Sequence, residues 1–160
     1  MKFKTLGIIA VASLAALSLA ACGAAPGGNS EASKGTEIGK TFKLGYDLEL
    51  SGGVAAYGNA GKNGANLAVD EINKAGGING KQITVISKDN KSDNAEAATV
   101  VSNLINNDKV NAVIGSMTSG AVKSMTPNVT KGAVPLVTPA GTDDTLTVTN
   151  GKVNDYIFRS

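Results

Sequence analysis

The sequence contains no histidine and no tryptophan, and it has a single cysteine among 160 residues. Histidine is the commonest general base and a favoured metal ligand, so its absence removes the usual means of acid–base catalysis and metal binding. One cysteine cannot form an internal disulfide bond or a cysteine-rich metal site. Charged residues are also sparse, at 18% of the chain. We therefore expect a binding protein without catalytic residues, metal or cofactor rather than an enzyme.

The first residues predict export from the cytoplasm. Lys2 and Lys4 precede an uncharged run of apolar and small residues from position 6 to position 21. This run is short for a membrane-spanning helix, which needs about 20 apolar residues. A basic start, a short apolar run and small residues at its end are typical of a secretory signal peptide, which we expect over residues 1–21.

The only cysteine, Cys22, lies directly after the apolar run. The sequence Leu19-Ala20-Ala21-Cys22 resembles the lipobox of bacterial lipoproteins. The resemblance implies that the Cys22 thiol carries a diacylglyceryl group and that Cys22 becomes the new N-terminus. Two acyl chains anchor a protein stably, so the expected location is the outer face of the cytoplasmic membrane, with the lipid bilayer as a partner. The alternative is an ordinary signal peptide cleaved near Ala21, with Cys22 incidental.

The mature chain is expected to be neutral and to begin with a linker. Without Lys2 and Lys4, 13 basic residues face 13 acidic ones, which argues against nucleic-acid binding. Residues 22–40 are rich in glycine, serine, alanine and asparagine and predict a flexible linker. Residues 35–41 resemble a phosphate-binding loop, but one residue is missing between the glycines, and a strand follows where a helix should.

From residue 42 onward, strand-like and helix-like periodicities alternate. Expected strands lie at residues 42–50, 82–87, 110–114, 133–138 and 156–159, and expected helices at 63–75, after Asp93, and at 119–131. Asp93 with Glu96 forms a capping box, and Pro127 should kink the third helix. Lys88 and Asp89 are expected as surface residues or caps. The alternation predicts an α/β fold, a doubly wound parallel sheet with helices on both faces, which binds ligands beyond the carboxyl ends of its strands.

Five stretches distributed along residues 50–160 resemble one family. They are residues 50–58, 68–80, 113–119, 134–142 and 156–160. Over residues 41–160 they are similar to the periplasmic binding proteins that serve ABC importers of branched-chain amino acids. The resemblance implies an incomplete N-terminal ligand-binding lobe at residues 41–160, the first of two lobes of a truncated type I periplasmic binding protein. It also implies a hinge between the lobes, a small-molecule amino acid ligand trapped between them, and an ABC permease as the membrane partner.

The resemblance also identifies ligand-binding residues in this lobe. The family's contact positions match Tyr57, Met117, Thr118, Ser119, Ala140, Gly141 and Thr142. Ser119 is expected at a helix N-terminus, where free N–H groups favour a ligand carboxylate. Thr142 and the Ala140 carbonyl can accept from an α-ammonium group, and Tyr57 offers a ring wall. Simpler roles are an N-cap for Ser119, a turn cap for Thr142 and rim packing for Tyr57.

Two loops depart from the family pattern. Ser51-Gly52-Gly53 replaces the usual Thr-Gly-Pro, which affects the rigidity of the first loop, and Asp143-Asp144 replaces a common Asn-Pro. The expected function is nonetheless the capture of an amino acid, branched-chain by resemblance, for import. Relatives bind amides, urea and aromatic acids, so those ligands remain alternatives.

Two other classes of protein are alternatives to a solute-binding protein. A ligand-binding ectodomain of a sensory receptor would need a later apolar stretch of about 20 residues. A Rossmann-type enzyme is suggested by Gly58, Gly61 and Gly64, but their G-x-x-G-x-x-G spacing differs from the dinucleotide-binding G-x-G-x-x-G.

Overall fold

A computed structural model describes residues 35–160. The expected signal peptide, the expected lipidation of Cys22 and residues 22–34 of the expected linker lie outside the described residues. Residues 35–41 lead directly into the first strand and not into a helix, so they do not form a phosphate-binding loop.

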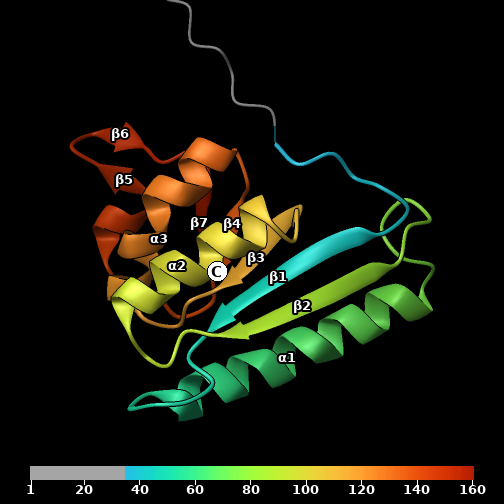
Figure 1. Cartoon of the computed structure of the whole chain (residues 1–160), viewed down its shortest axis with the longest axis horizontal. Helices are drawn as coiled ribbons and strands as arrows, with labels where there is room; N and C mark the ends of the chain where they lie inside the picture. Colours follow the sequence, from blue (N-terminus) through green and yellow to red (C-terminus); the bar gives the residue numbers. More distant parts are fainter. Residues whose placement is uncertain (1–34) are drawn as a thin grey trace, which may run out of the picture. The chain divides into compact units, whose positions relative to one another are not determined.

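The described chain forms a five-stranded parallel sheet with the strand order β2-β1-β3-β4-β7 (Figure 1). Its strands are β1 (Phe42–Leu48), β2 (Ile83–Asp89), β3 (Ala112–Gly115), β4 (Leu136–Thr138) and β7 (Ile157–Arg159), and its helices are α1 (Ala55–Lys74), α2 (Asn94–Asn106) and α3 (Ser119–Gly132). A short 3-10 helix, η1 (Asp144–Leu146), and a small hairpin of β5 (Val148–Thr149) and β6 (Lys152–Val153) separate β4 from β7. The strand order reverses between β1 and β3, which is the switch point where such sheets bind ligands.

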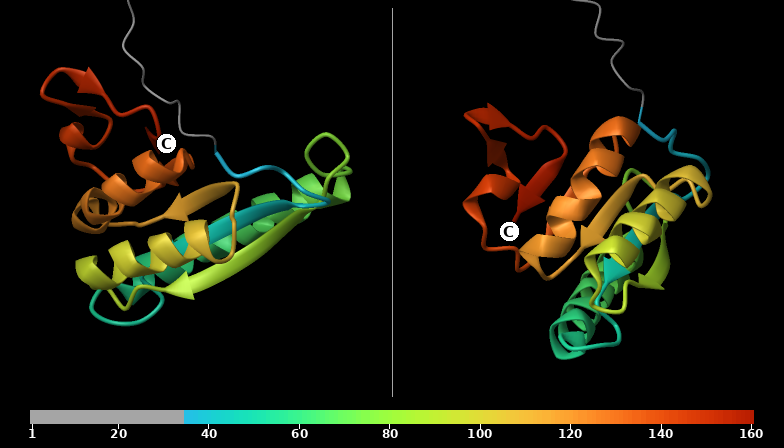
Figure 2. Two further views of the ribbon diagram at one scale, coloured as in Figure 1. Left: turned by 45° about the horizontal axis from the view of Figure 1, so that its top comes forward. Right: turned by 60° about the vertical axis from the view of Figure 1, so that its left-hand side comes forward.

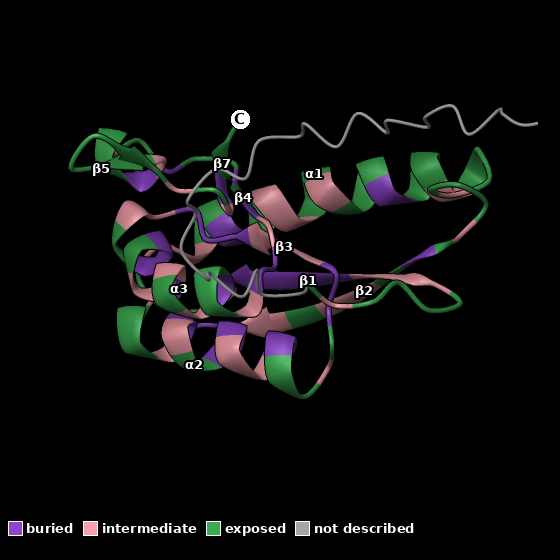
Figure 3. Ribbon diagram, turned by 90° about the horizontal axis from the view of Figure 1, so that it is seen from above, coloured by how far each residue is buried: buried purple, intermediate pink, exposed green. Residues whose placement is uncertain are grey.

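Helices cover both faces of the sheet, so the prediction of a doubly wound α/β fold is confirmed (Figure 3). Helices α2 and α3 pack against each other on one face, and α1 lies on the other (Figure 2). The larger apolar cluster joins α2 and α3 to the sheet through Val113, Leu136 and Ile157. The smaller cluster joins α1 to β1 through Val69 and Leu48. No helix within residues 35–160 combines the length and apolar character needed to cross a bilayer.

Helix α1 begins at Ala55, well before the expected start at Asn63. Glycine costs about 1 kcal/mol relative to alanine inside a helix, so Gly58 and Gly61 argued for a loop. The structure gives them a packing role, because a Cβ atom on Gly58 would lie 2.0 Å from the Glu49 carbonyl oxygen. A Cβ on Gly61 would collide with the Met117 side chain. These glycines therefore belong to a helix that approaches the sheet edge closely, and not to a dinucleotide-binding loop.

The other two helices follow their sequence signals more closely. Asp93 accepts a hydrogen bond from the Glu96 N–H at 2.7 Å, as a cap should, while the Glu96 carboxylate pairs with Lys91. The apolar spacing within residues 119–131 predicts one buried face, and the structure confirms it, with Ala121, Val122, Met125 and Val129 all in the core. Pro127 lies within α3. The apolar spacing within residues 63–75 likewise predicts one buried face, which is only partly right, because Val69 is buried while Ile72 is 39% exposed.

Candidate functional site

Six of the seven expected ligand-binding residues line one hollow of about 280 Å³ at the carboxyl ends of the strands. Its lining consists of Val54, Tyr57, Met117, Thr118, Ser119, Ala140 and Thr142. These residues come from three places, namely the start of α1, the junction of β3 with α3, and the loop after β4. Gly141 is the exception, because it faces an adjoining hollow. The expected convergence of Ser119 and Thr142 above one sheet edge is therefore present in the structure.

Ser119 joins the start of α3 to the loop after β4. Its Oγ accepts hydrogen bonds from the backbone N–H groups of Thr142, at 3.1 Å, and Asp143, at 3.2 Å. Ser119 is the first residue of α3, and the N-cap position belongs to Thr118, so the alternative role of Ser119 as N-cap is wrong. Because both bonds use the lone pairs of Oγ, the hydroxyl proton of Ser119 stays free to donate to a ligand.

The N-terminus of α3 adds backbone donors beside this hydroxyl. The first N–H groups of an α-helix have no acceptor inside the helix. In α3 the Val122 N–H bonds back to the Thr118 carbonyl at 3.1 Å, so the N–H groups of Ser119, Gly120 and Ala121 precede the first helical bond. Together with the helix dipole, these donors favour an anionic group at this end of the hollow.

A buried glutamate that sequence reasoning missed holds the loop before α3. Glu49 has no solvent exposure. Its Oε2 accepts from the Met117 N–H at 3.0 Å, and its Oε1 accepts from the Thr118 N–H at 3.2 Å and the Thr118 hydroxyl at 2.9 Å. In the sequence Glu49 follows an alternating apolar and acidic stretch, which suggests a solvent-facing side. Glu49 is nevertheless an interior residue, because helices cover both faces of the sheet (Figure 3).

A second buried carboxylate, Asp47, anchors a polar network that ends at Gly141 in the loop after β4. Asn90 donates from Nδ2 to Asp47 Oδ1 at 2.9 Å and to Ser116 Oγ at 2.7 Å. Thr138 in turn donates to the Ser116 carbonyl at 2.6 Å and accepts from the Gly141 N–H at 3.0 Å. The network therefore ties the carboxyl end of β1 to the loop after β4.

Asp47 titrates unusually because of this environment. Burial raises the pKa of Asp47 from 3.8 to about 7, against a lowering by the Asn90 hydrogen bond, and the nearby carboxylates of Glu49 and Glu96 add to the rise. Within the described residues, Asp47 Oδ2 has no hydrogen-bond partner. An unpaired buried oxygen favours the protonated form, which agrees with the raised pKa.

Asp89, expected only as a surface residue or cap, clamps the loop that leads to Tyr57. Its Oδ1 accepts from the backbone N–H groups of Leu50 (2.9 Å), Ser51 (3.1 Å) and Lys91 (2.8 Å), and its Oδ2 accepts from the Ser51 hydroxyl at 2.6 Å. Burial opposes ionisation of Asp89, but these hydrogen bonds together outweigh it and lower its pKa. Ser51, which departs from the family pattern, thus has a defined role in fixing the loop.

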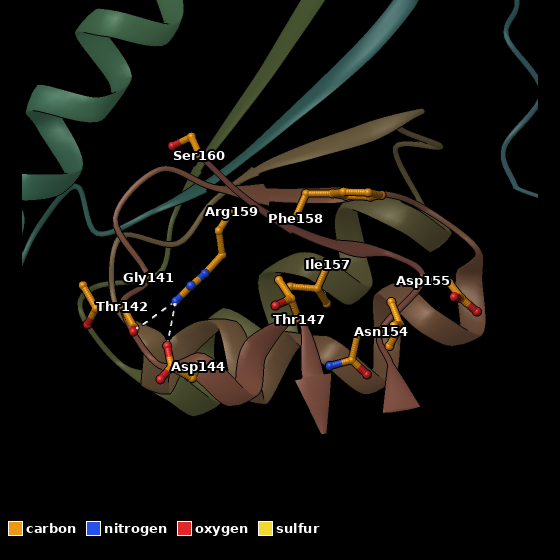
Figure 4. Close-up of a pocket in the computed structure, with 11 residues that line it drawn as sticks. Gly141, Thr142, Asp144, Thr147, Asn154, Asp155, Ile157, Phe158, Arg159 and Ser160 are labelled. Carbon is orange, nitrogen blue, oxygen red and sulfur yellow. Dashed lines mark hydrogen bonds and ion pairs between the residues drawn. The ribbon is translucent and has the colours of Figure 1, made fainter. Parts of the chain in front are cut away.

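The adjoining hollow, of about 950 Å³, lies between the loop after β4 and strand β7 (Figure 4). Arg159 crosses it and donates from Nη1 to the carbonyl oxygens of Thr142 at 3.0 Å and Asp143 at 3.3 Å. The Asp144 carboxylate lies 3.7 Å from the same nitrogen, and Asp143 pairs with Lys123. Lys123 lowers the pKa of Asp143, and hydrogen bonds from Thr145 lower it further. The Asp143-Asp144 departure therefore keeps the turn at Thr142 in place through ion pairs.

The lining of the hollow combines apolar and uncharged polar residues, which suits it to binding. Among residues 35–160, no carboxylate, lysine or arginine side chain lines it. Tyr57 is 66% exposed and forms an open apolar wall, while Met117 in the same lining is almost fully buried. Within residues 35–160, no three acidic or cysteine side chains gather to hold a metal ion.

Together, the switch point, the donor-rich helix end and the uncharged hollow define the ligand-binding lobe of a doubly wound α/β protein. Comparison with known proteins makes this more specific. Residues 41–160 match the family model described as "Periplasmic binding protein", and the chain belongs to this family. The family is one of solute-binding proteins rather than enzymes.

Curated relatives have names that describe amino acid binding. The chain is 32% identical over 120 residues to the leucine-, isoleucine-, valine-, threonine- and alanine-binding protein of Pseudomonas aeruginosa. The matched stretch covers 75% of this chain and 31% of the relative. It is 33% identical over 110 residues to the Leu/Ile/Val-binding protein of Escherichia coli K12, covering 69% of this chain and 30% of the relative. The chain thus spans about a third of the length of these relatives.

Solved structures of binding proteins from ABC transporters are similar to the chain. The branched-chain amino acid transporter substrate-binding protein LivJ of Streptococcus pneumoniae, in complex with isoleucine, is 55% identical with a TM-score of 0.70, over 75% of this chain and 33% of that one. A solute-binding protein of an ABC transporter from Rhodopseudomonas palustris, in complex with 3,4-dihydroxybenzoic acid, is 31% identical with a TM-score of 0.66, over 76% and 32% of the two chains. The prediction of a type I periplasmic-binding-protein lobe is confirmed.

Proposed function

We propose that this chain forms one wall of the binding site of an extracytoplasmic solute-binding protein, which captures a branched-chain amino acid for an ABC importer. The observation that carries the proposal is the junction of Ser119 with Thr142 at the N-terminus of α3. It brings donors and acceptors for both ends of a zwitterion into one hollow. The names of the relatives support the choice of amino acid.

The ligand carboxylate is assigned to the α3 end of the hollow. The free proton of the Ser119 hydroxyl and the N–H groups at the start of α3 supply several donors within the reach of one carboxylate. Hydrogen bonds to a charged group are stronger than neutral ones, and the helix dipole adds to them. Lysine or arginine is therefore not needed to hold the anion.

The ammonium group and the side chain take the remaining walls. The Ala140 carbonyl and the Thr142 hydroxyl can accept from the ammonium group, and both residues line the hollow. Val54, Tyr57 and Met117 offer apolar contacts to an aliphatic side chain. The assignment agrees with the expected roles of Tyr57, Met117, Ala140 and Thr142, and it places Gly141 as backbone support for the turn, since its N–H bonds to Thr138.

The wider role follows from the family. A second lobe that closes over the ligand would bury it and favour the closed state only when ligand is bound. The closed form would then dock on a permease. A diacylglyceryl anchor at Cys22 would keep the protein at the outer face of the membrane, where the permease lies.

Ligand-dependent stabilisation tests this function. A ligand that binds only the folded chain raises the unfolding temperature in proportion to RT ln(1 + [L]/Kd). We expect excess L-isoleucine to raise the unfolding temperature of the chain, and D-isoleucine, which carries the same charges, to raise it much less. A rise with 3,4-dihydroxybenzoate and none with L-isoleucine would assign the site to aromatic acids. The proposal would be contradicted if neither L-isoleucine nor 3,4-dihydroxybenzoate raised the unfolding temperature. It would also be contradicted if the two isoleucine enantiomers raised the unfolding temperature equally.

A further inference from the structure

Two neighbouring hydroxyl groups in the hollow are held in opposite hydrogen-bonding states. Ser119 Oγ accepts from two backbone N–H groups and so keeps its proton for a ligand. The Thr118 hydroxyl donates its hydrogen bond to the Glu49 carboxylate at 2.9 Å. We propose that Glu49 is a positioning residue that fixes Thr118 as a hydrogen-bond acceptor for the ligand's ammonium group. This inference rests on the proposed function and adds a residue pair to it.

The direction of the bond between Thr118 and Glu49 follows from the other partners of the carboxylate. Glu49 accepts backbone N–H donors on both oxygens, from Met117 at Oε2 and from Thr118 at Oε1. A carboxylate has no proton to donate, so the hydroxyl of Thr118 must be the donor. The Thr118 oxygen then has only lone pairs left, and it can act toward the hollow only as an acceptor.

Burial makes this arrangement effective. Glu49 is fully buried, and among residues 35–160 its hydrogen-bond partners are two backbone amides and one hydroxyl, with no lysine or arginine. Its negative charge is therefore neutralised only by dipoles. In a site of low dielectric constant, hydrogen bonds in a chain polarise one another, so the carboxylate strengthens Thr118 Oγ1 as an acceptor.

The pair of residues matches a zwitterion in charge as well as in geometry. Thr118 lines the hollow with a carboxylate behind it, while Ser119, the next residue, lines it with the N-terminus of α3 behind it. Glu49 occupies the amides of residues 117 and 118 and leaves those of Ser119 and Gly120 for the ligand. A carboxylate ligand without an ammonium group would gain a hydrogen bond from Ser119 but none to Thr118. The negative charge of Glu49 would also lower its affinity.

A purely structural role for Glu49 predicts different results. In that case Glu49 would only hold the loop, and changes at Thr118 would affect all ligands equally. The discriminating quantity is therefore the ratio of affinities for L-leucine and for 4-methylpentanoate, which has the same carbon skeleton and carboxylate but no ammonium group. Loosening of the loop lowers both affinities, whereas loss of the ammonium acceptor lowers only the first.

The first measurement needs no ligand. We expect the Thr118 hydroxyl proton to exchange slowly enough to give its own NMR signal in the unchanged chain, and that signal to disappear in Glu49→Gln. The Met117 and Thr118 amide signals should move upfield in the same variant, because an amide side chain cannot accept at both of its ends. Glu71→Gln, at an exposed position of α1, is the control and should change neither. A Thr118 hydroxyl that exchanges freely with water in the unchanged chain would overturn the proposal.

The second measurement is an NMR titration with the two ligands. Thr118→Val should lower the affinity for L-leucine about tenfold, because a hydrogen bond to a charged group is lost, and leave 4-methylpentanoate within about twofold. Thr118→Ser, which keeps the hydroxyl group, should bind L-leucine with the affinity of the unchanged chain. Thr126→Val is the matched control, because the Thr126 hydroxyl donates to the Val122 carbonyl on the same helix, away from the hollow. Equal losses for both ligands in Thr118→Val would overturn the inference about Thr118. If the unchanged chain bound neither ligand, the proposed function would fail, and the hydroxyl signal would still decide the state of Thr118.

Discussion

The backbone N–H of Thr142 donates to Ser119 Oγ at 3.1 Å, although the two residues are 23 positions apart in the chain. This bond, with its companion from the Asp143 N–H, closes the site on one side by joining two loops that end at the same sheet edge. It also determines that the Ser119 hydroxyl faces the hollow as a donor. The stability of the turn after β4 and the affinity for a carboxylate therefore depend on one side chain.

Ser119→Ala should weaken both properties. Two backbone N–H groups lose their acceptor, which we expect to lower the free energy of unfolding by about 1 kcal/mol, because both lie near solvent and water can replace the bond. Chemical denaturation measures this loss. Ser87→Ala, at an exposed position of β2, is the control and should change stability by less than about 0.5 kcal/mol. Equal effects of the two substitutions would mean that the bond to Thr142 contributes nothing.

The glycines of α1 offer a matched pair of substitutions with opposite signs. In Gly58→Ala the new Cβ would lie 2.0 Å from the Glu49 backbone oxygen, so the helix must shift, and we expect a loss of about 2 kcal/mol or more. In Gly64→Ala the new Cβ meets nothing within 4 Å, so the better helix propensity of alanine should raise stability by about 0.5–1 kcal/mol.

Thermal and urea unfolding of the two glycine variants would give both values. Helix α1 can begin as early as Ala55 because Gly58, which has no Cβ, lets the helix pass close to the Glu49 backbone just after β1. A Gly58→Ala variant as stable as Gly64→Ala would contradict that account.

Asp47 should make the chain less stable as the pH rises from about 4 to about 7. Its pKa is about 7 in the folded chain against 3.8 in its ordinary state, so the folded chain holds the proton more tightly. The stabilisation is complete below about pH 4 and is lost as the pH rises to about 7. A shift of about three pKa units corresponds to about 4 kcal/mol at most.

Asp47→Asn should therefore be more stable than the unchanged chain at pH 8 and should lose this advantage near pH 4. Unfolding in urea at several pH values measures the difference. Asp155→Asn, at an exposed site, should follow the unchanged chain throughout. An Asp47→Asn curve parallel to that of the unchanged chain between pH 4 and pH 8 would show that Asp47 does not titrate in this range.

Asp89→Ala should loosen the loop between β1 and α1. Four hydrogen bonds to Leu50, Ser51 and Lys91 are lost, and the amides of Leu50 and Ser51 should exchange with solvent faster, by about tenfold or more. Because the pKa of Asp89 is lowered, its contribution is present above the ordinary pKa of aspartate and is lost as the pH falls below it. Asp70→Ala, at an exposed position of α1, is the control. If the Ser51 amide exchanged with solvent at an unchanged rate in Asp89→Ala, then Asp89 would not hold this loop in place.

The sequence predicted the parts of the fold that follow from periodicity. Strands β1 to β4 and β7, the Asp93 cap and the buried face of α3 all lie where apolar spacing placed them. The convergence of Ser119 with Thr142 followed from topology, since parallel strands present their carboxyl ends at one edge. The β5–β6 hairpin was not predicted, because its strands are only two residues long.

The features that were missed depend on contacts between distant segments. Propensity places Gly58 in a loop, and only the position of Glu49 explains why a helix needs glycine there. Asp47 and Glu49 alternate with apolar residues, a pattern typical of a strand with one wet face, but helices cover both faces of this sheet. A charged residue in a central parallel strand was the available signal, because such strands are normally apolar.

The most direct test of the central claim is the location of bound L-isoleucine on the chain by NMR. The hollow is open and this chain spans about a third of its relatives, so we expect binding weaker than micromolar. The account predicts saturable shifts of the amide signals of Ser119, Gly120 and Thr142, which disappear in Ser119→Ala. Saturable shifts confined to residues outside the hollow, with those three amides unmoved, would contradict it.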